Sequence, residues 1–214
     1  MCGVELLRQL PAFLAAVVLI SAVPGPAVAL LIRRCSAGGF RAGVPVVLGL
    51  EAGLYLWILA AGAGLAALVA TSHVAYLVLR VVGAAVLLVL GVQALRAARR
   101  GAYDAELSAA RVLPRGRGGG FAMGLLTNAA NPKAAVFTFA FYPQFIPSGY
   151  PLLPTAAALG LLQIGVEICL YLSFAALVGR VRNWFAQARV RRRLDALCGA
   201  VLVALGLRVA TESQ

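Results

Sequence analysis

The stretch TNAANPKAAVF, residues 127–137, places two asparagines, a proline and the only lysine of the chain inside an otherwise apolar segment. A proline in a helix interior removes one backbone donor and frees the carbonyl four residues earlier, which here is that of Asn128. A lysine near the middle of a membrane span costs roughly 2.5–3.5 kcal/mol on insertion scales. The stretch therefore predicts a functional helix break built on Asn128, Asn131, Pro132 and Lys133.

The composition around this stretch is that of an integral membrane protein. Of the 214 residues, 62% are hydrophobic and only 12% are charged, which is too apolar for a soluble domain of this size. The apolar residues form unbroken blocks of about twenty, the length that a helix needs to cross a bilayer. We expect an all-α integral membrane protein with six transmembrane helices, near residues 11–32, 44–70, 75–94, 121–146, 152–178 and 194–209.

The net charge of +12 is explained by topology rather than by nucleic-acid binding. The arginines gather in the first, third and fifth connectors, and the second and fourth connectors hold none. Positive residues favour the cytoplasmic side. We therefore expect odd-numbered connectors in the cytoplasm and both termini outside, and no nucleic-acid partner.

The chain divides into two halves of three spans, residues 1–95 and 121–214, joined by a basic cytoplasmic linker, 96–120. Spans two and five carry EAGLYLW and EICLYLS, and spans three and six carry GAAVLLVLG and GAVLVALG. The break in span four has a counterpart in span one at Pro24, Gly25 and Pro26. Two inverted repeats with interrupted helices in corresponding positions predict a secondary transporter whose site lies near the midplane.

Two carboxyl groups, Glu51 and Glu167, lie deep inside predicted spans. Each is followed four residues later by a tyrosine, Tyr55 or Tyr171, on the same helix face. We expect each tyrosine hydroxyl to donate to its carboxylate. The two acids and Lys133 form either a structural ion pair or a binding site for substrate and protons.

Little else in the sequence carries chemistry. The four cysteines have no CxxC spacing and His73 has no neighbouring ligand, so we expect no metal and no cofactor. The glycine pairs 49/53 and 62/64 are typical of close helix contacts, which also makes a homodimer plausible. Without a phosphate-binding loop, nucleotide-driven transport by this chain is not expected.

These motifs resemble the lysine-exporter (LysE/RhtB-type) family of bacterial amino-acid efflux proteins. The resemblance covers nearly the whole chain: Pro24-Gly25-Pro26, then RAGVPVVLGLEAG, VVGAAVLLVLGVQALR, GLLTNAANPKAAVFTFAFYPQF and LCGAVLVALGLRVA. It implies six spans in the bacterial inner membrane and gradient-driven export of amino acids or their derivatives. At Leu54 the chain departs from many relatives, which place an acidic residue there.

The resulting hypothesis is a non-enzymatic exporter that works by alternating access, with protons as the coupling ion. The substrate carboxylate would lie near Lys133 and Asn131. Its ammonium would lie near the carbonyls freed around residues 24–26, or near Glu51 or Glu167. The alternatives are a transmembrane redox protein, which would need apposed cysteines, and a metal-ion exporter, which would need softer ligands than the spans offer.

Overall fold

The structure, a computed structural model, describes residues 2–23, 25–71, 73–100, 117–147, 149–180, 183 and 187–211. These residues form helices and short turns and contain no strand, which confirms the all-helical class. The elements are α1 (Cys2–Ala22), α2 (Pro26–Thr71), α3 (His73–Arg100), α5 (Arg117–Ala129), α6 (Pro132–Phe141), the 3-10 helix η1 (Tyr142–Gln144), α7 (Leu152–Ala176) and α9 (Ala188–Thr211).

Both predicted helix breaks are present in the structure. The first lies between Ala22 and Pro26, where α1 gives way to α2, and the second lies between Ala129 and Pro132, where α5 gives way to α6. In each case a proline starts the new helix. Proline is tolerated at this position because it has no backbone N–H, and an N–H in the first turn would have no acceptor within the helix.

The first predicted connector, residues 33–43, contains a sharp change of backbone direction. The chain is helical on both sides of Gly39. Gly39 has φ 70° and ψ −173°, a conformation that side chains with a Cβ rarely adopt. Gly39 therefore changes the direction of the chain within α2. The part of α2 before Gly39 belongs to span one, and the part after it contains span two.

The apolar lengths of the helices vary. Among the described residues, Pro26–Gly64 and Leu152–Ala176 are long and apolar enough to cross a bilayer, while Leu6–Ala22 and Ala84–Arg96 are shorter apolar helices. The breaks shorten the apolar runs of spans one and four. Helices cover all six predicted spans, and their crossing of the membrane remains a prediction.

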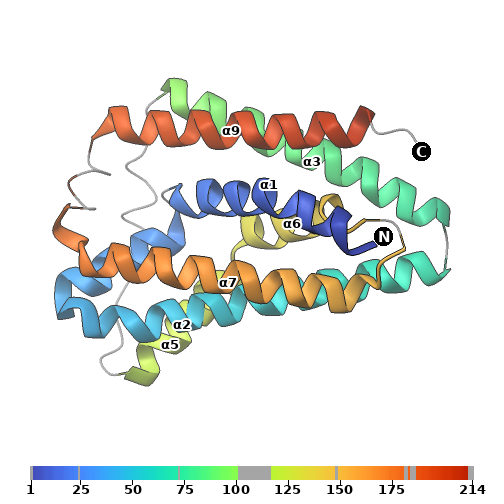
Figure 1. The fold of residues 1–214 in the computed structure, drawn as a ribbon. Helices are drawn as coiled ribbons and strands as arrows, with labels where there is room; N and C mark the ends of the chain where they lie inside the picture. Colours follow the sequence, from blue (N-terminus) through green and yellow to red (C-terminus); the bar gives the residue numbers. More distant parts are fainter. Residues whose placement is uncertain are drawn as a thin grey trace.

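The helices pack as a bundle around α2, which lies against α5 and α7, while α3 pairs with α9 along one side (Figure 1). Glycines allow the closest approaches. An added Cβ on Gly49 would collide with the carbonyl oxygen of Phe121, and one on Gly53 would lie 2.9 Å from that of Leu125. The predicted contact role of the 49/53 pair is therefore confirmed.

An aromatic cluster joins α1 to the end of span four. The ring of Phe13 lies 5.4 Å from that of Phe141 and 5.3 Å from that of Phe145, and Tyr142 completes the group. All four side chains are fully buried. Offset and edge-on rings add to the apolar burial, so this cluster fixes α6 and η1 relative to α1.

We predict that Gly49→Ala destabilises the bundle. The new methyl group meets backbone rather than a flexible side chain, and overpacking of this kind costs about 1–3 kcal/mol. The thermal unfolding temperature of the purified protein in detergent should fall. Gly165→Ala on α7 is the matched control, because its added Cβ meets nothing within 4 Å; equal unfolding temperatures for the two variants would contradict the packing.

Candidate functional site

At the span-four break, the carbonyl that Pro132 frees has two donors. The oxygen of Asn128 accepts the backbone N–H of Asn131 at 3.1 Å and the indole Nε1–H of Trp57 at 3.3 Å. The Asn128 side chain serves another helix, because its Nδ2 donates to the Leu50 carbonyl at 2.7 Å. Asn128 therefore ties the break to α2 through both its backbone and its side chain.

At the span-one break, backbone hydrogen bonds form at the end of α1 and at the start of α2. The N–H of Val23 reaches the Ile20 carbonyl at 3.3 Å, and the N–H of Ala29 reaches that of Gly25 at 2.9 Å. Ser21 donates its hydroxyl to the Val17 carbonyl at 2.7 Å. Pro24 lies outside the described residues, so its predicted role has no structural description.

The two breaks open onto one cavity. It encloses about 90 Å³, and since one water-sized group needs roughly 10–15 Å³ of such space, it holds on the order of six to nine non-hydrogen atoms. That is the size of a small amino acid. Its polar lining comes from both breaks and from α7: Ser21, Asn128, Asn131, Gln163, Glu167 and Tyr171. Its apolar lining includes Ile20, Val28, Leu54 and Phe137.

Glu167 is the acidic side chain of this lining, and it is held by hydrogen bonds. Its Oε1 accepts the amide of Gln163 at 2.6 Å, and the Gln163 Oε1 accepts the hydroxyl of Tyr142 at 2.8 Å. Ser21 belongs to the same lining. The chain Tyr142–Gln163–Glu167 thus links the aromatic cluster to the cavity.

Glu51 has different surroundings from Glu167, although the two share one motif. It is 3% exposed, it is not part of the cavity lining, and its Oε2 has no hydrogen-bond partner. The two carboxyl groups are near enough to repel each other electrostatically. Glu51 is therefore a buried acid close to Glu167 but outside the cavity lining.

For the predicted tyrosine partners, donation of each hydroxyl to its carboxyl group stays a prediction. Because Glu51 Oε2 has no donor, the hydroxyl of Tyr55 does not bond to that oxygen; the Tyr55 ring instead packs against Gly160 of α7. Tyr171 lines the cavity, as Ser21 does. An i, i+4 spacing places two residues on one helix face, but it does not determine the hydrogen-bond partner of either side chain.

Other predicted residues are placed only in part. Gly25, Pro26 and Asn131 line the cavity. Pro132 and Lys133 begin α6 next to it, but their side chains, like that of His73, lie outside the described residues. The predicted pairing of Lys133 with a carboxylate stays a prediction.

Sequence reasoning missed Ser21, Gln163 and Tyr142. Gln163 had a detectable signal, because it is a lone amide in an apolar span and lies four residues before Glu167, on the same face. Asp195, at the second position of predicted span six, was also overlooked and is 5% exposed. Tyr142 gave no such signal, because its contact with Gln163 depends on how α6 and α7 pack.

The cysteines lie away from this chemistry. Cys35, Cys169 and Cys198 lie on three different helices as reduced thiols, and none of them is in the cavity lining. Among the described residues, no group of three or more His, Cys, Asp or Glu side chains is arranged to hold a metal ion.

We predict that Gln163→Leu lowers stability by leaving two buried polar groups without their partner. The Tyr142 hydroxyl and the Glu167 carboxyl each lose a bond, and an orphaned buried group costs about 1–3 kcal/mol. Thermal unfolding in detergent should show the loss. Gln93→Leu, at an exposed position on α3, is the control and should change little; an unaltered unfolding temperature for Gln163→Leu would contradict the network.

Comparison with known proteins agrees with this architecture. Residues 18–213 match the family described as LysE type translocator. The homoserine/homoserine lactone efflux protein of Salmonella typhimurium is 32% identical over 200 residues, covering 94% of this chain and 95% of that protein. An uncharacterized membrane protein of Vibrio cholerae is 29% identical over 205 residues, 94% of this chain and 95% of its own length. No solved structure matches. The chain belongs to the LysE type translocator family.

Proposed function

We propose that this protein is a secondary-active exporter of small amino acids or their derivatives across the bacterial inner membrane. The observation that carries the proposal is the cavity formed where two interrupted helices meet, with the carboxyl group of Glu167 in its wall. The family, and the efflux of homoserine and its lactone named for the Salmonella relative, support the same class of cargo.

The cavity offers complementary ends to a zwitterion. Helices α2 and α6 both begin at the breaks, so their N-termini supply unpaired N–H groups and a positive dipole end to a substrate carboxylate. Asn131 lines the same region, and Lys133 begins the helix beside it. Glu167 provides the counter-charge for the ammonium, while the apolar wall suits a short uncharged side chain.

Several contacts support two inverted three-helix repeats, residues 1–95 and 121–214, around this cavity. The glycines of α3 and α9 meet reciprocally, since an added Cβ on Gly91 would lie 2.9 Å from the Gly199 carbonyl and one on Gly199 would lie 2.7 Å from that of Gly91. Spans two and five also pack closely, where Gly62 meets Ala156 and Gly160 meets Ile58. Rocking of one repeat against the other would then give alternating access.

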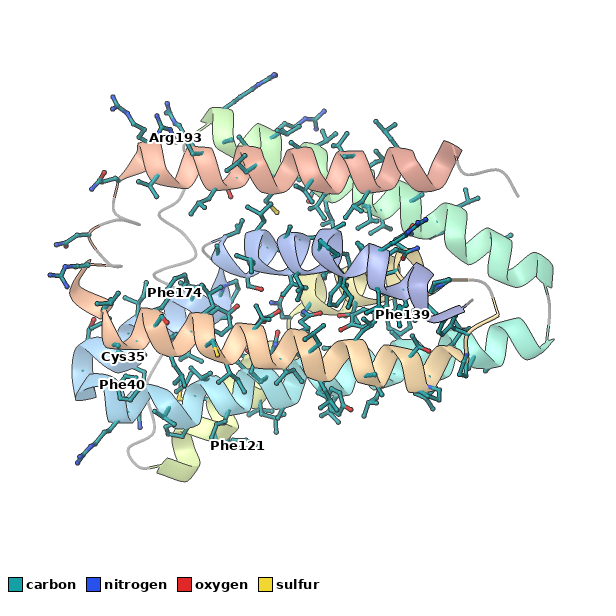
Figure 2. The ribbon with its side chains drawn as sticks, in the orientation of Figure 1. Cys35, Phe40, Phe121, Phe139, Phe174 and Arg193 are labelled. Atoms are coloured by element: carbon teal, nitrogen blue, oxygen red, sulfur yellow. The ribbon has the colours of Figure 1, made fainter. Side chains whose placement is uncertain are left out.

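The proposed orientation has both termini outside and the odd-numbered connectors in the cytoplasm. The start of α1 and the end of α9 lie toward the same end of the bundle in Figure 1, as an even number of spans requires. Arg193 and Phe40 lie toward the opposite end in Figure 2. A basic end opposite the termini fits the rule that positive residues stay in the cytoplasm.

The proposal is tested by screening amino acids for reduced intracellular accumulation on expression of the protein, with homoserine in the panel. Glu167→Gln and Lys133→Ala should each abolish export, since each removes a charge that binds the zwitterion. Gly165→Ala is the control and should export normally. Membrane levels are compared by immunoblot, and normal export by both charge variants would reject this site.

A further inference from the structure

The two buried carboxyl groups occupy unequal environments, and that inequality suggests separate tasks. We propose that Glu167 binds the ammonium of the substrate and that Glu51 carries the proton exchanged for it. This inference rests on the exporter function proposed above and assigns a role to each acid within it.

The surroundings of Glu167 suit an ionised carboxylate. It lines the cavity, and its Oε1 accepts a short bond of 2.6 Å from Gln163. Because the Gln163 oxygen is occupied by the Tyr142 hydroxyl at 2.8 Å, the amide must present its NH₂ group to Glu167. The network therefore supplies a donor to a negative charge that an ammonium can reach.

The surroundings of Glu51 suit a neutral carboxylic acid. Its Oε2 is buried with no hydrogen-bond partner, and the residue is not part of the cavity lining. A buried carboxylate with an oxygen that has no donor is far costlier when ionised than when protonated. A proton on Glu51 removes that cost and also the repulsion from Glu167.

The described groups that interact with Glu51 lie on α7 and on α2 itself. Glu167 and Tyr171 of α7 interact with it electrostatically, and Tyr55 is its neighbour one turn along α2. The described side chains of α5, residues 119–129, are uncharged. Among the described side chains, Glu167 is therefore the charged group whose state most directly affects whether Glu51 can lose its proton.

This arrangement links the two cations as an antiporter requires. An ammonium at Glu167 neutralises the charge there and adds a positive charge nearby, which favours ionisation of Glu51. Substrate entering from the cytoplasm therefore releases a proton to water on that side. After the substrate leaves outward, Glu51 takes up a proton from outside, so each cycle exports one amino acid and imports one proton.

The test separates binding from coupling in proteoliposomes, with homoserine as the first probe. Exchange of labelled for unlabelled homoserine moves no net proton, whereas accumulation driven by a pH gradient requires one. Glu51→Gln, a mimic of the protonated acid, should retain exchange and lose the response to the gradient. Glu167→Gln should lose both, because it removes the ammonium ligand.

Three outcomes overturn the assignment. If Glu51→Gln still accumulates homoserine under the gradient, Glu51 does not carry the proton. A folded Glu51→Gln protein without exchange would make Glu51 part of the binding site. Retained exchange by Glu167→Gln would remove the ammonium site.

A measurement on the wild type needs no folded variant. Homoserine added to the purified protein in weakly buffered detergent solution should release protons, detected with a pH-indicator dye. Binding without proton release overturns the division of roles. By contrast, if the wild type exchanges no amino acid of the panel, the exporter function itself fails.

Discussion

The architecture depends on the backbone groups that prolines leave open inside an apolar bundle. Hydrocarbon supplies no water to satisfy them, so an interrupted helix is tolerated only where protein or a wet cavity provides partners. At the span-four break, Trp57 and the N–H of Asn131 satisfy the Asn128 carbonyl. The same constraint explains why both breaks adjoin one cavity and why α2, which supplies Trp57, lies at the centre of the bundle.

Much of this arrangement was predictable from the chain itself. Apolar blocks gave the helices, and the two proline motifs located the breaks, because proline acts on its own helix whatever surrounds it. The glycine pair at 49 and 53 correctly indicated a close contact, since small residues at that spacing leave backbone exposed on one face. These sequence features act on their own helix, so they can be interpreted without knowing how the helices pack.

The sequence did not show how each helix is rotated about its axis relative to its neighbours. Glu51 and Glu167 begin the same motif, yet Glu167 is part of the cavity lining and Glu51 is not. Helix periodicity gives the face that a residue occupies but not the rotation of that helix against its neighbours. The Tyr142–Gln163 bond was missed for this reason, and the turn at Gly39 was missed because charge and hydropathy locate a connector without giving its backbone conformation.

The family comparison and the cavity constrain the cargo from different directions. Relatives that cover nearly the whole chain carry names for the efflux of a small hydroxy amino acid and its lactone. The cavity has room for a ligand of that size and offers both hydrogen-bonding and apolar walls. Neither observation depends on the other, so their agreement strengthens the proposed substrate class.

The central claim is that the cavity between the two breaks is where the substrate binds. It is tested most directly by thiol labelling of Ala134→Cys, a half-buried lining position, in a variant whose four native cysteines are replaced by serine. Homoserine, or the exported amino acid found by the screen, should slow labelling at position 134. It should leave labelling of Ala130→Cys unchanged, because that exposed position near the same break is not in the lining. Equal labelling rates at position 134 with and without saturating substrate would contradict the account.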